Sequence, residues 1–350
     1  MFQFLGMLAA IALTAFCWGV YGPVLHFGRE AMHSALRPFV CVGLAYFVIA
    51  VLVPLMLLAR GERGGWTMKG VIWSLLAGTA GALGALGVIL ALNFGGKPIY
   101  VMPLVFGGAP VVNTLLSAAM NRSFGQLKAP FLAGLILVIT GAVTVLVFKP
   151  QTAPHTKPAA AVVAAEAGAA AEGGAAAGDA AAPAARGGQK AERFLEVLLA
   201  VAMAMFSWGA YGPVLHRGQA AMAGSRLRPL ICIGVAYFLI AVLVPLALLV
   251  PTGDTGSWDF GGTLWSLGAG ALGALGALGT ILAFACGGKP FTVMPVVFGC
   301  APVINTLTTL ALAHTPLSAL SPWFLAGLLV VAVGAATVLA FGPRGHAPAK

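Results

Sequence analysis

The sequence predicts an all-α polytopic membrane protein with ten transmembrane helices, arranged as two inverted five-helix repeats. Three observations lead to this fold class: the composition, the number of apolar segments long enough to span a bilayer, and a duplication of the chain. Of the 350 residues, 60% are hydrophobic and only 8% are charged, and the mean hydropathy is +0.98. Soluble domains do not have this composition, so a polytopic membrane protein is expected.

Ten apolar segments have about the 20 residues that a helix needs to cross a bilayer. Each is expected to form one membrane-spanning helix, and the segments fall into two groups of five. They cover residues 4–27, 36–59, 70–94, 98–120 and 129–148, followed by 194–216, 227–250, 262–286, 290–313 and 322–341.

Residues 149–193 separate the two groups and are rich in Ala, Gly and Pro. Frequent glycines and few large apolar residues are typical of a flexible tether rather than a folded domain. The predicted organisation is therefore a first membrane repeat at 1–148, a tether at 149–193 and a second membrane repeat at 194–343.

The two groups of spans are copies of each other. The string Trp-Gly-Val-Tyr-Gly-Pro-Val-Leu-His at 18–26 recurs with one substitution at 208–216, and residues 95–114 recur almost letter for letter at 287–306. The offset between matching residues changes by only a few residues, so the whole unit is duplicated. Because each copy crosses the membrane an odd number of times, the second copy must be inverted relative to the first.

The basic residues of the short loops indicate the orientation, because cytoplasmic loops carry an excess of Lys and Arg. Three lie on the side opposite the N-terminus: Arg29, Arg37 and Lys97. Eleven lie on the side of the N-terminus: Arg60, Arg63, Lys69, Arg122, Lys128, Arg217, Arg226, Arg228, Lys289, Arg344 and Lys350. Both termini are therefore expected in the cytoplasm, with the tether outside. The net charge of +10 is explained by topology and lipid headgroups, and no nucleic-acid partner is expected.

Two inverted five-span repeats with both ends inside resemble the drug/metabolite transporter superfamily, in its EamA-like ten-span form. The residues that carry the resemblance are the Trp-Gly pairs at 18–19 and 208–209 and the prolines of the fourth spans, Pro103, Pro110, Pro295 and Pro302. One departure is the region after each fourth span, where members often carry a glutamate and this chain has Asn121 and His314. The resemblance implies export or uptake of small metabolites.

An aromatic motif in the first span of each copy is the first candidate site. Trp18 and Tyr21 share one helical face, and Gly22-Pro23 follows; the copy has Trp208, Tyr211 and Gly212-Pro213. A proline removes one backbone donor and loosens the helix. Gating or a helix break is therefore predicted at Gly22-Pro23 and Gly212-Pro213, and at the fourth-span prolines Pro103, Pro110, Pro295 and Pro302. The motif is interpreted either as an aromatic wall of a polar cavity or as packing aromatics beside a kink, and both interpretations stay open.

Asn113 and Asn305 are the most polar groups deep in the fourth and ninth spans. An amide in hydrocarbon is costly unless it is paired, so each asparagine is expected either to bind substrate or to join two helices by a hydrogen bond. From the 1.5 Å rise per residue, Trp18 matches the depth of Asn305, and Trp208 that of Asn113. We therefore expect each copy's Trp/Tyr face to meet the other copy's asparagine near the midplane.

Four residues near the ends of spans are predicted to lie at the mouths: Lys97 and Lys289, each before a proline, and His26 and His216. Interfacial anchoring and hydrogen bonding are the favoured roles. Attraction of an anionic substrate, or titration of a histidine near neutral pH, is the second interpretation.

The repeated glycines, Gly81, Gly84 and Gly87 with Gly273, Gly276 and Gly279, are expected to allow close helix packing rather than to bind phosphate. No catalytic motif is present, and no cofactor or metal is expected. All nine acids lie outside the deep apolar segments, so no intramembrane carboxylate is available for proton coupling: Glu30, Glu62, Glu166, Glu172, Asp179, Glu192, Glu196, Asp254 and Asp259.

These features together favour an inner-membrane transporter rather than an enzyme, with a small polar metabolite bound between the repeats and moved by alternating access. A sugar-like or amino-acid-like substrate fits the amides, hydroxyls and aromatic rings. The alternatives are a flippase for a lipid-linked substrate and a membrane scaffold or sensor that does not transport. The expected partners are the substrate, the bilayer and a possible second copy in a homodimer.

Overall fold

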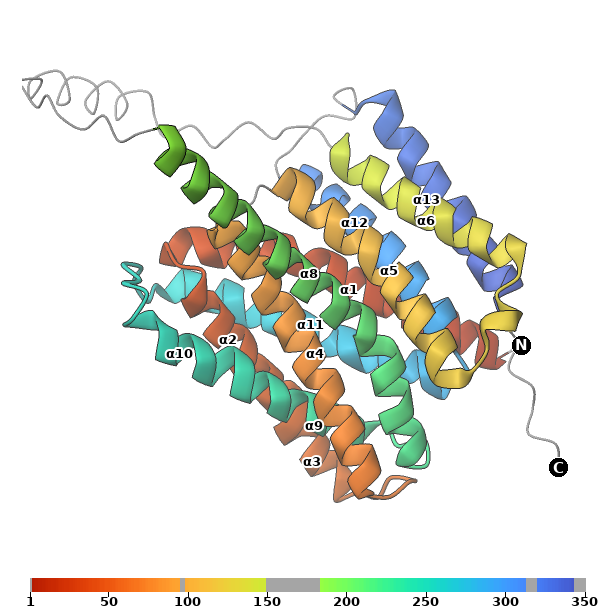
Figure 1. The fold of residues 1–350 in the computed structure, drawn as a ribbon. Coiled ribbons are helices and arrows are strands. Elements are labelled where there is room, and N and C mark those ends of the chain that lie inside the picture. The colour runs from red at the N-terminus through yellow and green to blue at the C-terminus, as the bar shows by residue number, and fades with distance from the viewer. Residues whose placement is uncertain (1, 95–97, 149–182, 313–319, 343–350) are drawn as a thin grey trace, which may run out of the picture.

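The computed structural model describes residues 2–94, 98–148, 183–312 and 320–342 (Figure 1). Within these ranges, ten helices are long and apolar enough to cross a membrane. The protein is therefore an all-α polytopic membrane protein, as the sequence predicts.

The first repeat contains five spans, the second of which is divided by a π-helical segment. Its elements are α1 (Phe2–Met32), α2 (Leu36–Phe47), η1 (Val48–Leu52), α3 (Val53–Leu58), α4 (Met68–Asn93), α5 (Pro98–Asn121), the short η2 (Phe124–Gln126) and α6 (Ala129–Val147). The second repeat follows the same order. Its elements are α8 (Pro183–Ala221), α9 (Leu227–Tyr237), η3 (Phe238–Leu243), α10 (Val244–Leu249), α11 (Phe260–Ala285), α12 (Pro290–Leu312) and α13 (Pro322–Phe341).

The equivalent helices α1 and α8 start at opposite ends of the bundle, which shows the inversion of the repeats (Figure 1). We call the end at which α1 starts the inner end and the opposite end the outer end, after the charge-based orientation. Helix α8 begins at Pro183, so the last residues of the expected tether continue this helix. Residues 149–182 lie outside the described ranges.

The two repeats interlock through their first and third spans. Helix α1 packs along α11, and α8 packs along α4, so each repeat supplies the neighbour of the other repeat's first helix. Helices α6 and α13 pack against each other beside α5 and α12, at the upper right of Figure 1. The two repeats therefore form one bundle rather than two separate domains.

The axis that relates the repeats passes between Tyr46 and Tyr237. Their rings stack at 3.7 Å between centroids with an interplanar angle of 1°. Each tyrosine is the eleventh residue of a 23-residue span, so the stack lies near the middle of the membrane. A residue that stacks on its own repeat-related copy lies beside the axis, and because the repeats are inverted, this axis runs in the membrane plane.

Two ion pairs join the repeats symmetrically at the ends of the bundle. Arg228, at the start of α9, pairs with Glu62 at 3.2 Å, and the equivalent Arg37 of α2 pairs with Asp254. Each carboxylate belongs to the loop before the other repeat's third span. These contacts fix the second and third spans of opposite repeats to each other.

The prediction that the glycine-proline positions break helices is wrong. Helices α1 and α8 continue through Gly22-Pro23 and Gly212-Pro213, and α5 and α12 continue through Pro103, Pro110, Pro295 and Pro302. In a packed membrane helix, neighbouring helices compensate for the lost backbone donor, so the helix persists.

The irregular backbone lies elsewhere, in the π-helical segments η1 and η3. Each ends two residues before a proline, Pro54 in α3 and Pro245 in α10. A proline ring clashes with the carbonyl four residues earlier, and a wider π turn relieves that clash. Both copies have this feature next to the central tyrosine stack.

Candidate functional site

The sequence-predicted residues Trp18, Tyr21, Asn113, Trp208, Tyr211 and Asn305 form the central seam between the repeats. Helix α1 packs on α12, and α8 packs on α5, so the predicted helix pairs are confirmed. A Cβ atom on Gly22 would lie 2.4 Å from Nδ2 of Asn305, and one on Gly212 would lie 3.0 Å from Oδ1 of Asn113. Each asparagine therefore meets the glycine of the other repeat's Gly-Pro pair.

The two tryptophans pack against the glycine-rich helices α11 and α4. The indole Nε1–H of Trp18 donates to the Gly273 carbonyl at 3.2 Å, and that of Trp208 donates to the Gly81 carbonyl at 3.1 Å. The only polar atom of each ring is used in joining two helices, which favours the packing interpretation of these rings.

Glycine is required where these rings pack. A Cβ atom on Gly84 would lie 2.1 Å from the Trp208 ring, and one on Gly276 would lie 2.2 Å from the Trp18 ring. The glycines thus create the space for an aromatic side chain from the other repeat, which confirms their predicted role in close packing.

The two equivalent tyrosines differ in burial. Tyr211 is 4% exposed, its ring meets that of Trp18 edge-on at 5.7 Å, and its hydroxyl has no partner among the described residues. Tyr21 is only half-buried. The inner half of the seam is therefore packed more tightly than the outer half.

The asparagines show the same difference. Asn113 is fully buried, and its Nδ2 donates to the carbonyl of Pro290, the first residue of α12, at 2.9 Å. Asn305 is half-buried. Because Asn113 lies nearer the inner end of α5, its hydrogen bond holds the start of α12 against the inner half of the seam.

Two further contacts close the inner end. Nε2 of Gln219 on α8 donates to the Ile281 carbonyl of α11 at 3.1 Å, and the His216 ring lies edge-on to Phe284 at 5.3 Å. These two contacts and the bond from Asn113 to Pro290 are here called the inner gate. They tie α8 and α5 of one side to α11 and α12 of the other.

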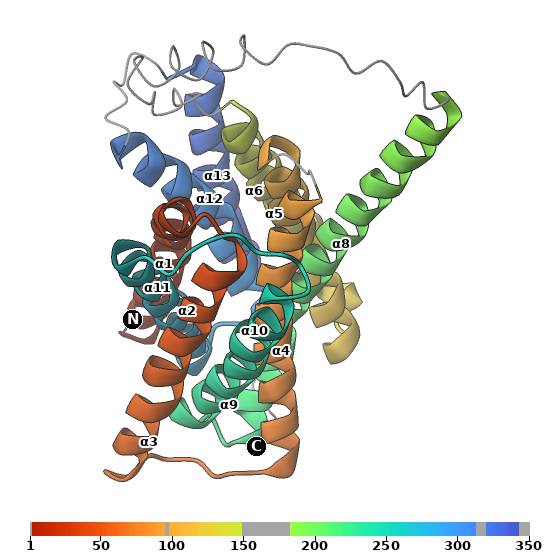
Figure 2. The ribbon, with the colours of Figure 1, turned by 90° about the vertical axis from the view of Figure 1, so that its left-hand side faces the viewer.

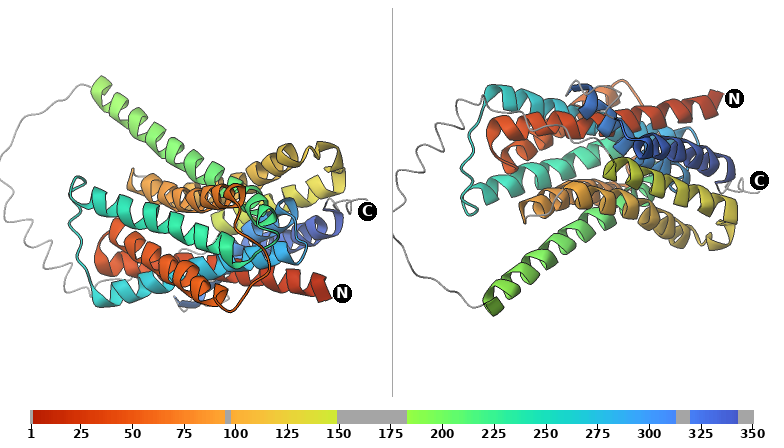
Figure 3. Two further views of the ribbon diagram at one scale, coloured as in Figure 1. Left: turned by 90° about the horizontal axis from the view of Figure 1, so that it is seen from below. Right: turned by 90° about the horizontal axis from the view of Figure 1, so that it is seen from above.

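The outer end lacks the equivalent packing. Helix α8 contacts α11 and α12, whereas α1, the copy of α8, makes no contact with α4 or α5 in the described part of the chain. Figure 2 shows α1, α2 and α11 on one side and α4, α5 and α8 on the other. In Figure 3 the outer part of α8 diverges from α1 and α11. The bundle is thus closed at its inner end and separated at its outer end.

Buried polar atoms without a hydrogen-bond partner gather beside the inner gate. Among the described residues, six of them lie on α4, α5 and α8: Ser74 Oγ, Asn113 Oδ1, Thr114 Oγ1, Ser117 Oγ, Tyr211 Oη and Gln219 Oε1. Buried polar groups are nearly always paired in native proteins. This concentration therefore marks a place where a polar ligand or water could supply the missing partners.

Arg29 is a residue that the sequence reasoning used for topology but did not assign to the site. It occupies the position equivalent to Gln219, near the outer end of α1. Helical side chains lean toward the N-terminus of their helix, which for α1 is toward the membrane interior. Arg29 is half-buried. A comparison of the two copies could have identified Arg29, because this arginine stands where the other copy has Gln219.

The predicted mouth residues do not share one environment. The exposed His26 pairs with Glu30, one turn along α1, at 3.2 Å. His216 belongs to the inner gate, and Lys289 is half-buried beside it at the start of α12. Lys97 lies outside the described residues. Among the described mouth residues, His216 thus contacts α11, on the opposite side of the bundle, through its ring, as a mouth-closing residue would.

Comparison with known proteins supports the fold and nothing finer. No family model matches the chain, and no curated protein matches it. One solved structure, described only as "Crystal structure of protein", has 18% sequence identity and a TM-score of 0.62, and the match covers 97% of this chain and 98% of that chain. At this identity the likeness shows a shared architecture over nearly the whole length.

Proposed function

We propose that the protein is a transporter that moves a small polar metabolite across the cytoplasmic membrane by alternating access. One observation carries the proposal: two repeat-related half-sites in one molecule are packed differently. Asn113 is fully buried and bonded to Pro290, while its copy Asn305 is half-buried. In an inverted repeat, exchange of the two packings turns a molecule that is open outward into one that is open inward.

The seam offers the contacts that a small polar substrate needs. The unpartnered Tyr211 hydroxyl and Asn113 carbonyl oxygen lie on the inner side, and Tyr21 lies on the less buried outer side. Arg29 adds one cation that makes no ion pair with a described carboxylate. A substrate with a carboxylate and a polar body fits this set, so Arg29 favours the amino-acid-like alternative over a neutral sugar.

The proposed cycle needs no carboxylate inside the membrane. Among the described residues, no aspartate or glutamate is buried. Facilitated diffusion or exchange is therefore the form of transport that the seam favours, since proton-driven carriers commonly use an intramembrane acid.

Screening followed by transport tests the proposal. The purified protein is first heated with a panel of amino-acid derivatives and sugars, because a ligand that binds only the folded state raises the melting temperature. The ligand that gives the largest shift is then used, radiolabelled, in proteoliposome uptake. Asn113→Ala is expected to abolish uptake and leave membrane insertion intact.

Thr140→Ala is the matched control, because this exposed α6 threonine bonds only to carbonyls of its own helix. It is expected to transport normally. Normal uptake by Asn113→Ala would remove this residue from the site. A panel in which no compound shifts the melting temperature, and none is taken up, would favour the scaffold alternative.

A further inference from the structure

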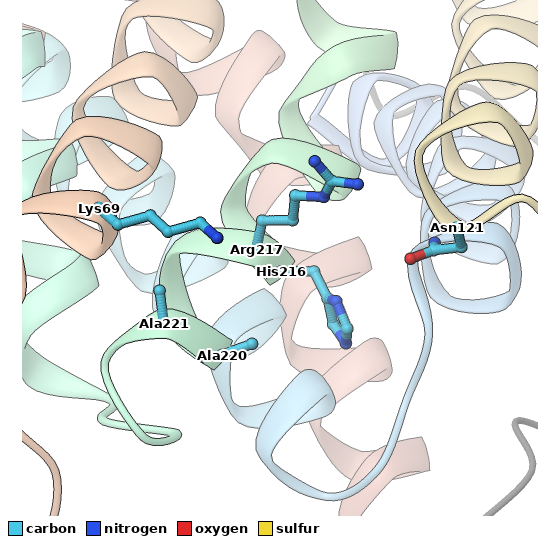
Figure 4. Close-up of a pocket in the computed structure, with 6 residues that line it drawn as sticks. All are labelled: Lys69, Asn121, His216, Arg217, Ala220 and Ala221. Atoms are coloured by element: carbon cyan, nitrogen blue, oxygen red, sulfur yellow. The ribbon is translucent and has the colours of Figure 1, made fainter. Parts of the chain in front are cut away.

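A pocket of about 290 Å³ opens at the inner end of the bundle, away from the central seam. It lies over the last turns of α8, between the start of α4 and the end of α5 (Figure 4). Its lining residues are Lys69, Asn121, His216, Arg217, Ala220 and Ala221. Lys69 extends its ammonium group toward α8, where Arg217 stands (Figure 4). The pocket therefore brings two permanent cations together.

The pocket lies between the two repeats, at the inner end of a lipid-facing stripe of α8. Leu195, Phe206 and Arg217 follow one another at intervals of three helical turns, so they share one face of α8. Leu195 is 56% exposed and Phe206 57% exposed, and large apolar side chains exposed on a membrane helix contact the acyl chains. Arg217 continues this lipid-facing stripe to the level of the headgroups, near the inner end of α8.

The surrounding residues fix Arg217 but do not neutralise it. Its guanidinium donates to the Met120 carbonyl of α5 and lies 5.4 Å over the Trp73 ring of α4. Lys69 is exposed. Among the described residues, the carboxylates that form ion pairs are those of Glu30, Glu62 and Asp254, and none of them pairs with Lys69 or Arg217. The positive charge of the pocket is thus left without a described carboxylate partner.

The outer end provides an internal comparison, because the duplication places an equivalent position there. Phe27 stands in place of Arg217, and Gly261 stands in place of Lys69. Phe27 packs on Trp265 at 5.1 Å, as Arg217 packs on Trp73, the copy of Trp265. The architecture is therefore shared, and only the inner copy is cationic.

We propose that this pocket binds the phosphate of an anionic phospholipid headgroup in the inner leaflet. Arginine and lysine are the side chains that bind phosphate, through charge-assisted hydrogen bonds, and basic pockets between helices at the cytoplasmic face bind anionic headgroups. The lipid-facing stripe of α8 receives the acyl chains, and the Asn121 amide adds a neutral hydrogen-bonding group. The inference rests on the membrane fold and does not depend on the transport proposal.

The site adjoins the inner gate. His216 lines the pocket and also contacts Phe284 of α11. A bound headgroup would therefore rest against a residue that holds the inner end closed.

Native mass spectrometry of the full-length protein in detergent, titrated with phosphatidylglycerol or phosphatidylcholine, tests the site. The wild type is expected to retain phosphatidylglycerol preferentially. Lys69→Gln is expected to weaken this binding about five-fold, the effect of one basic residue at the surface. Arg217→Lys keeps the charge and is expected to retain most of the binding, while Arg217→Gln weakens it about as much as Lys69→Gln.

Lys128→Gln is the matched control. Lys128 is an exposed lysine at the same end of the bundle, and this substitution removes the same charge as Lys69→Gln. An equal loss of binding in this variant would overturn the site in favour of general surface attraction. Inorganic phosphate is titrated in parallel. If it protects the wild type against heat as well as phosphatidylglycerol does, and Lys69→Gln removes both effects equally, free phosphate is the ligand and the lipid proposal is wrong.

Discussion

The two ends of this bundle are built from copies of the same unit, yet they are packed differently. At the inner end, Asn113 bonds to a backbone carbonyl of the other repeat, and Gln219 bonds to a backbone carbonyl of α11. At the outer end, their copies Asn305 and Arg29 are half-buried. Copies of one unit are therefore packed in two ways in the same molecule, with one packing at each end.

The contacts of the two central tryptophans with the glycine-rich helices do not differ between the repeats. Trp18 and Trp208 make equivalent hydrogen bonds, and the glycines beneath them leave equivalent space. The Tyr46–Tyr237 stack lies on the axis itself. We infer that the centre is retained during the proposed cycle, while the ends exchange their packings.

The largest expected effect is in this symmetric centre. Gly276→Ala places a methyl group 2.2 Å from the Trp18 ring, and overpacking of a filled core costs about 1–3 kcal/mol. Gly84→Ala is expected to cost a similar amount, since its methyl group would lie 2.1 Å from Trp208. The apparent melting temperature in detergent measures both losses.

Gly268→Ala is the control on the same helix, because its nearest neighbour is 3.9 Å away. It is expected to be neutral or slightly stabilising, since alanine favours a helix over glycine. A large loss in only one of Gly84→Ala and Gly276→Ala would break the equivalence of the two centres.

A smaller effect is expected where the ends differ. Asn113→Ala removes the bond to Pro290, and interhelical hydrogen bonds in membranes contribute about 0.6–2 kcal/mol. The inner gate should then open about three-fold to thirty-fold more often. The rate of maleimide labelling at Ser117→Cys, a fully buried position one turn further inward on α5, reports this opening in a background with the five native cysteines replaced.

Asn305→Ala in the same background tests the asymmetry. Asn305 is half-buried, so its replacement by alanine should not accelerate the labelling of Ser117→Cys. Equal acceleration by the two alanine variants would mean that both asparagines hold the inner end, and the distinction between the half-sites would be lost.

The sequence predicted the parts of the fold that depend on composition and counting. Ten apolar segments set the number of spans, and an odd number in each copy required the inversion. The pairing of α1 with α12 and of α8 with α5 followed from the depths of Trp18 and Asn305 along their helices. These predictions succeed because the bilayer fixes helix length and direction.

The predictions that failed depend on side-chain contacts. Gly22-Pro23 was expected to break its helix, but the neighbours of a membrane helix compensate for a lost donor, and the π turns formed instead before Pro54 and Pro245. The role of Trp18 was ambiguous because an aromatic ring suits a cavity wall and a packing site equally. The sequence alone could not reveal the different states of Asn113 and Asn305, because the two residues lie in nearly identical strings.

Distances between spin labels at the two ends test the central claim most directly. One pair is placed at Ala220 and Cys286 across the inner end, and its repeat-related pair at Glu30 and Phe94 across the outer end, with the other cysteines replaced. In the Asn113→Ala, Gln219→Ala double variant, alternating access predicts that the inner distance lengthens while the outer distance shortens. Lengthening of the inner distance with no change at the outer end would contradict the account, because the two ends would then open independently.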